Sequence, residues 1–196
     1  MKIAILGAES TGKTQLAQNL HAHWSALGRS ALWVPEVLRE WCEREGRTPQ
    51  PHEQWGICHE QAARVLQAPA VDWLIADTTP LMTAIYSELL FADRTLYDFA
   101  LAHQRLYDLT LVMGLDLPWV EDGLQRDGPH VREPVDRLLR AALEQGGVRY
   151  QVICGSGPQR LAAAMRSVSQ HKMNDQHPVD CVEQISPNDL QRNQAP

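Results

Sequence analysis

The stretch that decides the fold is Gly7-Ala8-Glu9-Ser10-Thr11-Gly12-Lys13-Thr14, close to the start of the chain. It matches G-x-x-x-x-G-K-[ST], the pattern of a loop that wraps around the phosphates of a nucleotide. The glycines let the backbone curl so that its N–H groups face phosphate oxygens, and the helix that follows adds a partial positive charge. We expect Lys13 to reach the β and γ phosphates and Thr14 to bind Mg²⁺.

The surroundings of this loop are those of a parallel α/β sheet. A short apolar strand, Lys2–Leu6, precedes the loop, and a helix with one apolar face, Lys13–Leu27, follows it. Nearly continuous apolar runs, typical of strands buried on both faces, predict further strands at Ala31–Val34, Trp73–Ala76, Leu109–Met113 and Tyr150–Cys154. Helices are expected at His52–Gln67, Pro80–Phe91, Thr95–Gln104, Pro134–Gln145 and Pro158–Val168. This alternation predicts an α/β fold with right-handed crossovers.

Length and composition fit one domain with a tail. The chain has 196 residues, of which 44% are apolar and 21% charged, so a sizeable core can form. We expect residues 1–168 to form this domain. Residues 169–196, rich in Gln, Asn, Asp and Pro, are predicted to be a flexible or loosely packed tail. The sequence indicates no oligomeric state.

Charge and hydropathy exclude several functional classes. A net charge of −6 argues against a dedicated nucleic-acid binder, although a nucleotide needs only a local positive pocket. No window approaches the roughly 20 apolar residues of a membrane span, and the N-terminus turns polar at Glu9, too soon for a signal peptide. The four cysteines form no CxxC pair. We therefore expect a cytoplasmic protein without membrane insertion.

The fate of the γ-phosphate separates the remaining nucleotide-binding classes. A GTPase would carry an Asn-Lys-x-Asp reader of guanine, which is missing, and Asp-x-x-Gly after its switch strand. The third strand here is followed by Asp77-Thr78-Thr79-Pro80. A motor-type ATPase usually places Glu directly after this Asp, whereas the chain has Thr78. These features favour a phosphoryl transferase that uses ATP and an organic hydroxyl acceptor.

Candidate catalytic groups follow the strands, because ligands of open α/β sheets bind beyond the carboxyl ends of the strands. Asp77 would bind Mg²⁺ through water or hold the acceptor; the alternative is a cap for the next helix. Glu36 follows the second strand, where it would act as a base or bind a ribose hydroxyl. Arg39, one helical turn later, would hold the acceptor or a phosphate. The alternative for this pair is a charged first helical turn on the surface.

The polar segment near residues 117–132 follows the fourth strand and contains Arg126 and Arg132. It suits a mobile lid that brings an arginine onto the transferring phosphoryl group. We favour Arg126 for this role, with an ordinary solvated loop as the alternative.

Aromatic residues offer a surface on which a substrate base would stack. Six tryptophans are many for this length, and Trp41, Trp55 and Trp119 lie outside the expected core. We assign Trp55 to the substrate site, with simple packing as the alternative. The turn Gly155-Ser156-Gly157-Pro158 after the last strand would pass beside the adenine or merely cap a helix.

Four segments together resemble one known family over about residues 1–168. They are Gly7–Thr14 with its Glu9-Ser10, Glu36-x-x-Arg39-Glu40, Ile75-Ala76-Asp77-Thr78, and Pro118-Trp119-Val120-Glu121-Asp122-Gly123-Leu124-x-Arg126. The family is the ribosylnicotinamide kinase domain, found at the C-terminus of the bifunctional NAD-biosynthesis regulator and in stand-alone relatives. The segment around Trp119 is its most specific part.

This resemblance implies a P-loop kinase fold, a three-layer sandwich with a five-stranded parallel sheet. It also implies ATP-dependent phosphorylation of the 5′-hydroxyl of nicotinamide riboside, which gives nicotinamide mononucleotide, with a functional link to a riboside transporter. In this interpretation Lys13 and Arg126 stabilise charge, Thr14 and Asp77 manage Mg²⁺, and Glu36 orients or deprotonates the acceptor. The alternatives are a kinase for another nucleoside or metabolite, a non-catalytic ATP-dependent regulatory module, and a nucleic-acid ATPase.

Overall fold

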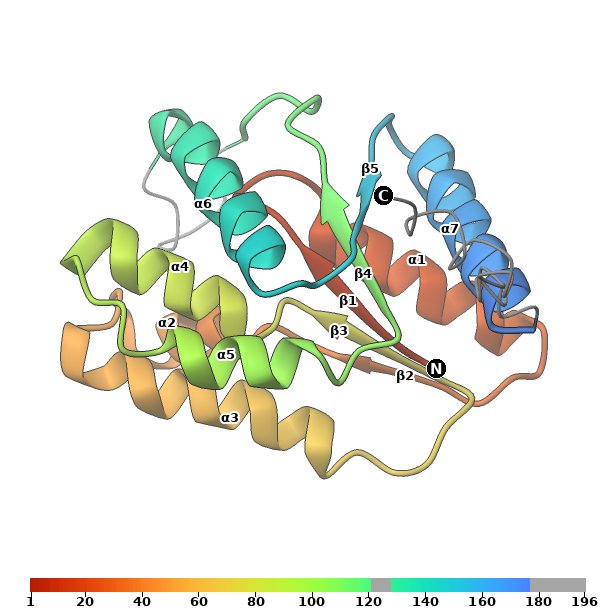
Figure 1. Ribbon diagram of the computed structural model, residues 1–196, viewed down its shortest axis with the longest axis horizontal. Helices are drawn as coiled ribbons and strands as arrows, with labels where there is room; N and C mark the ends of the chain where they lie inside the picture. Colours follow the sequence, from red (N-terminus) through yellow and green to blue (C-terminus); the bar gives the residue numbers. More distant parts are fainter. Residues whose placement is uncertain (121–127, 177–196) are drawn as a thin grey trace, which may run out of the picture.

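A single parallel sheet organises the computed structural model, which describes residues 1–120 and 128–176. The strands of this part of the chain are β1 Lys2–Leu6, β2 Ala31–Val34, β3 Trp73–Asp77, β4 Leu109–Met113 and β5 Gln151–Ile153. They pair in the order β2-β3-β1-β4-β5, and every neighbouring pair is parallel (Figure 1). The predicted fold class, a five-stranded P-loop kinase-like sandwich, is thereby confirmed.

Helices cover both faces of the sheet and complete three layers (Figure 1). Their bounds are α1 Lys13–Ala26, α2 Val37–Glu45, α3 Gln54–Leu66, α4 Pro80–Phe91, α5 Tyr97–Gln104, α6 Arg132–Gln145 and α7 Pro158–Gln176. Helices α1 and α7 pack on one face, where Leu16 and Leu20 join Ile3 and Ile5 in a fully buried cluster. Helices α4, α5 and α6 pack on the other face. Helix α2 lies on α3 at the β2 edge.

The strand and helix positions follow the sequence pattern closely. Thr79 caps α4, because its Oγ1 accepts a hydrogen bond from the N–H of Leu81 at 3.2 Å, and Pro80 occupies the first helical position. The fold differs at α3, which begins only at Gln54 because a short 3-10 turn, Pro51–Glu53, precedes it.

Helix α7 continues past the predicted boundary at 168 to Gln176. Ser167 and Val168 end the buried face of α7, and beyond them Lys172 lies over the ring of Trp73 at 4.1 Å from its centroid. The remainder of the predicted tail lies outside the described residues. The division into a domain of residues 1–168 and a tail therefore stays a prediction.

Candidate functional site

The phosphate-binding loop connects β1 to α1 in the conformation that its glycines permit. Gly7 has a φ of +149° and Gly12 a φ of +78°, both in a region that side chains disfavour. A Cβ on Gly7 would lie 3.0 Å from the Cβ of Met113, so the loop also requires glycine for close packing against β4. The Thr11 hydroxyl and the Lys13 ammonium donate to the carbonyl of Ala8 at 2.7 and 3.0 Å. These bonds hold the loop curled.

Asp77 ends β3 beside this loop, in register with Ile5 of β1. Only 1% of its surface is exposed, and burial raises the pKa of its carboxyl group. A hydrogen bond from Thr14 and the positive charges of Lys13 and Arg39 oppose this shift in pKa. Because Thr79 caps α4, Asp77 is not needed for the alternative role as a helix cap.

The Asp77 and Thr14 pair has the donor set that Mg²⁺ prefers. The Oδ1 of Asp77 is buried and has no hydrogen-bond partner among the described residues. A hard cation would satisfy that oxygen, and Mg²⁺ typically binds one or two protein oxygens together with phosphates and water. In the part of the chain that the structure describes, no three acidic, His or Cys side chains gather into a metal cage. The residues therefore fit a metal held jointly by protein and nucleotide.

A cavity of about 340 Å³ opens next to the phosphate-binding loop. One part of its lining comes from the strand ends and includes Lys13, Glu36, Arg39 and Thr78. Glu36 occupies the N-cap position of α2, but its side chain makes no capping bond. The cavity therefore brings together an ammonium, a carboxylate and a guanidinium beside the loop.

Thr78 carries backbone strain at this point of the site. Its φ is +70°, which is unusual for a β-branched residue, and its N–H donates to the carbonyl of Ile5 at 3.1 Å. Strained residues of this kind concentrate at functional sites, where the surrounding structure holds them in place.

The other part of the lining is largely apolar and comes from the helices. Met82, Tyr86 and Leu90 recur every four residues along α4, so they share one helical face toward the cavity. Phe91 and Leu38 also line it. The remaining lining residues are Glu9, Ser10, Cys42, Thr48, Pro49, Gln50 and Gln54. A flat apolar wall opposite charged groups suits a ligand with a ring and hydroxyl groups.

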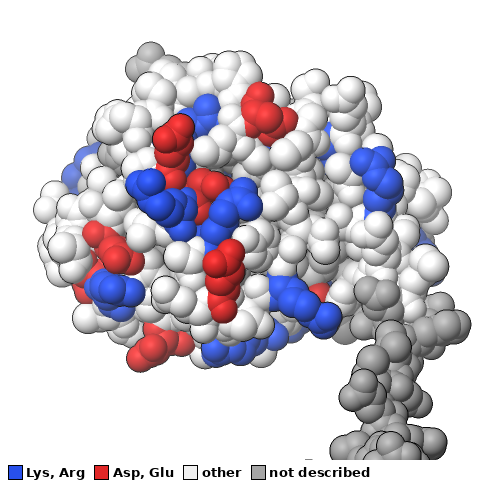
Figure 2. Space-filling model, turned by 45° about the horizontal axis from the view of Figure 1, so that its top comes forward, with Lys and Arg blue, Asp and Glu red and all other residues white. Residues whose placement is uncertain are grey.

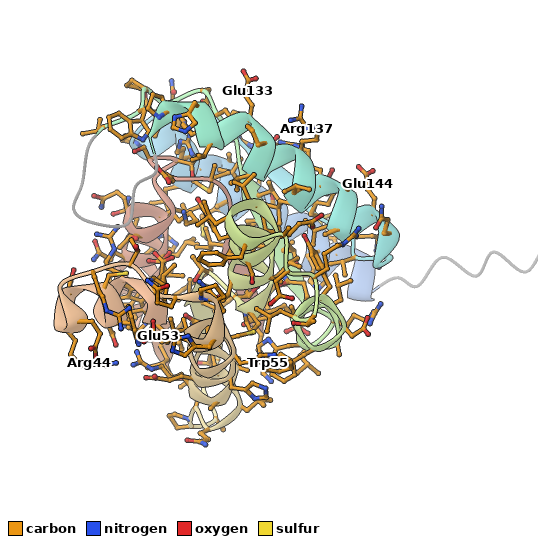
Figure 3. The ribbon with its side chains drawn as sticks, turned by 90° about the vertical axis from the view of Figure 1, so that its left-hand side faces the viewer. Arg44, Glu53, Trp55, Glu133, Arg137 and Glu144 are labelled. Carbon is orange, nitrogen blue, oxygen red and sulfur yellow. The ribbon has the colours of Figure 1, made fainter. Side chains whose placement is uncertain are left out.

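The structure does not bring every predicted residue to this cavity. Trp55 is a residue of α3 and is 42% exposed; its ring stacks on His59 at 4.9 Å between centroids and is tilted against Phe99 of α5 at 5.9 Å (Figure 3). Trp55 does not line the cavity, so its assignment to the substrate site stays a prediction. Tyr86 and Phe91 are the aromatic residues that line it.

The predicted lid is only partly within the described residues. Arg126, the favoured lid arginine, lies outside them. Arg132 is buried at the start of α6, and its Nη2 donates to the carbonyl of Leu117 at 2.8 Å. This arginine therefore fixes the chain after β4 and does not reach the phosphate-binding loop through any contact described.

Arg160 is a residue beside the phosphate-binding loop that the sequence analysis missed. It is 4% exposed and donates from Nη1 to the Thr11 carbonyl, from Nε to the Gly155 carbonyl and from Nη2 to Asp116 Oδ1, each at 2.6 Å. Asp116 Oδ2 also accepts from the Gly155 N–H at 2.6 Å. Arg160 therefore joins the segments that follow β1, β4 and β5 by hydrogen bonds. No local pattern around Arg160 predicts a contact with a loop so distant in sequence.

A second long-range contact joins the loop to the segment after β4. The indole Nε1 of Trp119 donates to Glu9 Oε2 at 3.2 Å. The Ser10 hydroxyl donates to the Val120 carbonyl at 2.8 Å and accepts from the Val120 N–H at 3.2 Å. Trp119 therefore contacts the phosphate-binding loop.

Comparison with known proteins agrees with this geometry. The sequence profile of a family described as "AAA domain" matches residues 2–160. No curated protein sequence matches the chain. A solved structure of deoxyadenosine kinase from M. mycoides, with the product dCMP and a flexible dCDP bound, is 15% identical with a TM-score of 0.59. The match covers 87% of this chain and 100% of that one.

A structure of NadR protein in complex with NAD and AMP-PNP is also similar. It is 18% identical with a TM-score of 0.67, and the match covers 88% of this chain. The chain spans about half the length of that protein, because the match covers 49% of it. At these identities the two structures establish a shared fold.

Proposed function

This chain belongs to the AAA domain family, and on that premise we propose that it is an ATP-dependent kinase that phosphorylates a hydroxyl group of a small nucleoside. The observation that carries the proposal is the cavity of about 340 Å³, which joins the P-loop Lys13 to Glu36 and Arg39. A hydrolase needs only a water beside the γ-phosphate. A hollow of this size with a partly apolar lining suits an organic acceptor.

The residue after Asp77 supports transfer over hydrolysis. ATPases that hydrolyse usually orient the attacking water with an acidic residue at this position, whereas this chain has Thr78. A carboxylate is instead supplied to the cavity by Glu36, at the end of the neighbouring strand β2. That position suits a group that faces an acceptor bound between α2 and α4.

In the proposed reaction the acceptor hydroxyl oxygen bonds to the γ-phosphorus as the bond from that phosphorus to the β,γ-bridging oxygen breaks. Glu36 accepts the hydroxyl proton, and ADP leaves. Lys13 stabilises the negative charge that develops on the phosphates, and Arg39 orients the acceptor. Mg²⁺ held by Thr14 and Asp77 would neutralise phosphate charge. Arg126 is our proposed lid cation.

We further propose nicotinamide riboside as the acceptor, with nicotinamide mononucleotide as the product and a role in NAD biosynthesis. The support is the set of segments that resemble the ribosylnicotinamide kinase domain, together with the shared fold of NadR. A cytoplasmic location and a functional link to a riboside transporter complete this proposal. Within the described chain, no helix is both long enough and apolar enough to cross a membrane.

The test is an acceptor panel read by mass spectrometry, with purified protein, Mg²⁺-ATP and nucleosides that include nicotinamide riboside. We expect nicotinamide mononucleotide from the parent protein and none from Lys13→Ala. Glu36→Gln should lower kcat by about 10²- to 10⁴-fold, the usual contribution of a general base. The matched control is Glu43→Gln, which changes an exposed glutamate of α2 outside the cavity lining and should leave kcat within twofold.

Other outcomes of this panel point to the alternatives. Phosphorylation of a different nucleoside would keep the mechanism and reject the nicotinamide assignment. ATP binding without any product would favour the regulatory module. A nucleic-acid ATPase would show hydrolysis stimulated by DNA or RNA. On the face shown in Figure 2, basic and acidic side chains are interspersed, whereas a polynucleotide backbone would require a continuous basic surface.

A further inference from the structure

We propose that Gln54 recognises the polar group on the ring of the acceptor, and that it selects rings carrying an N–H donor such as a carboxamide or an exocyclic amine. This inference rests on the proposed function, because it concerns the acceptor cavity of the same site. Gln54 is the first residue of α3 and lines that cavity.

Gln54 is a buried amide with an unmet hydrogen bond. It is 3% exposed, and its Oε1 has no partner among residues 1–120 and 128–176. Buried polar atoms in proteins are almost always paired, because an unpaired atom loses its bonds to water without replacement. A buried acceptor in a cavity wall is therefore open to a donor from the contents of the cavity, and we assign that donor to the ligand.

The other buried glutamines of the described chain are paired within the fold. Gln61, two turns further along α3, accepts from the Val37 N–H at 2.8 Å and donates to the Pro35 carbonyl at 3.3 Å. Gln104 accepts from the Thr79 hydroxyl at 2.6 Å and donates to Thr110 at 3.0 Å. The fold thus satisfies both of these amides internally. Only at Gln54 does a buried glutamine oxygen remain available at the cavity.

The lining around the cavity determines which ligand group Gln54 meets. The α4 side presents Met82, Tyr86 and Leu90, which suit the faces of a flat ring. The charged residues Lys13, Glu36 and Arg39 come from the strand ends and serve the phosphate and hydroxyl groups. An amide on α3, which packs against α4, is placed to read the substituent of a ring held there.

The chemistry of this oxygen gives a specific selection. Oε1 accepts hydrogen bonds only, so it favours an –NH₂ group and disfavours a carboxylate, which carries no proton at neutral pH. Nicotinamide riboside and nicotinic acid riboside differ in this one substituent. We expect the parent protein to bind nicotinamide riboside about 10- to 100-fold more tightly than nicotinic acid riboside. This range corresponds to the free energy that is lost when one buried hydrogen-bonding group is left unpaired.

The experiment measures binding of both ribosides by calorimetry without ATP, and then kcat/KM for each with Mg²⁺-ATP. Gln54→Met retains a similar unbranched shape but removes the polar atoms. It should lose the preference, mainly through weaker binding of nicotinamide riboside. Gln54→Glu retains an acceptor oxygen and should keep or sharpen the preference for the amide. Gln67→Leu, at an exposed glutamine at the end of the same helix, is the control and should bind as the parent does.

The outcomes separate this inference from the proposed function. Equal binding of the two ribosides by the parent protein would overturn the role of Gln54, as would a preference that survives Gln54→Met or reverses in Gln54→Glu. If selective binding depends on Gln54 but ATP yields no phosphorylated product, the kinase proposal fails while the recognition stands. Circular dichroism confirms that each variant is folded, and if Gln54→Met is not, Gln54→Glu decides alone.

Discussion

Replacement of Arg160 by methionine should weaken both the fold and nucleotide binding. The side chain is 5% exposed and is the common donor to Thr11, Gly155 and Asp116. Arg160→Met preserves much of the volume but leaves these oxygens without the donor. The carbonyl of Thr11 belongs to a fully buried residue of the phosphate-binding loop, so water does not readily replace the arginine.

The size of the effect follows from the individual contacts. A hydrogen bond from a charged donor contributes about 1.5–3 kcal/mol, and two short ones here go to backbone carbonyls, with a third, to the Gly114 carbonyl, at 3.5 Å. The pair with Asp116 adds little, because that carboxylate is 37% exposed and solvent screens it. We expect the free energy of unfolding to fall by about 3–5 kcal/mol. For a chain of this length the melting temperature should fall by roughly 6–20 °C.

Urea unfolding followed by circular dichroism measures the stability, and calorimetry with a non-hydrolysable ATP analogue measures affinity. We expect the Kd to rise at least about tenfold, which corresponds to about 1.4 kcal/mol of lost loop organisation. Arg166→Met, at an exposed arginine of the same helix, should change stability by less than about 0.5 kcal/mol. If Arg160→Met unfolds within 1 kcal/mol of Arg166→Met, the reasoning about the buried arginine is wrong.

Three further predictions concern the loop, the metal ligand and the cavity wall. Gly7→Ala should cost about 1–3 kcal/mol in urea unfolding, more than Gly28→Ala, whose Cβ meets nothing within 4 Å; equal costs would contradict the contact argument. Because burial raises the pKa of Asp77 in the free protein, kcat/KM for Mg²⁺-ATP should fall on acidification at a pH above the usual aspartate range of about 4, and a profile flat to that pH would count against this role. Because the pKa of Asp77 is raised in the folded state, protonation of Asp77 stabilises the folded protein. Acid unfolding driven by this group therefore does not explain the loss of activity. Tyr86→Leu should raise the acceptor KM about three- to tenfold and Trp55→Leu less than twofold, and the reverse order would support the sequence-based assignment.

The sheet and the phosphate-binding loop were predictable because their signals are local. Continuous apolar runs marked the strands, and G-x-x-x-x-G-K-[ST] fixed both the loop and the start of α1. Strand ends then located Glu36 and Asp77 without knowledge of the helices, because parallel strands share one carboxyl edge. These predictions needed no information about contacts between distant residues.

The cavity wall was not predictable in the same way. Trp55 and Tyr86 are both aromatic residues on helices, and only the packing of α3 against α4 and α5 decides which of them lines the cavity. A hydrophobic pattern locates a helix face but does not say whether the opposite surface is core or cavity. The same limit applies to Gln54, whose burial depends on how the chain enters α3 through the 3-10 turn.

Hydrogen bonds connect two of the segments on which the family resemblance rests. These are the phosphate-binding loop and the segment around Trp119, which lie far apart in the sequence. In the motif the glycines, lysine and threonine serve the nucleotide, whereas the intervening positions are free to differ between families. Here two of those positions, Glu9 and Ser10, are hydrogen-bonded to Trp119 and Val120. An apolar residue at Glu9 would remove the acceptor of the Trp119 indole, and an apolar residue at Ser10 would remove both of its hydrogen bonds to the Val120 backbone. These two positions therefore hold the segment after β4 against the phosphate-binding loop, and a change in either segment constrains the other.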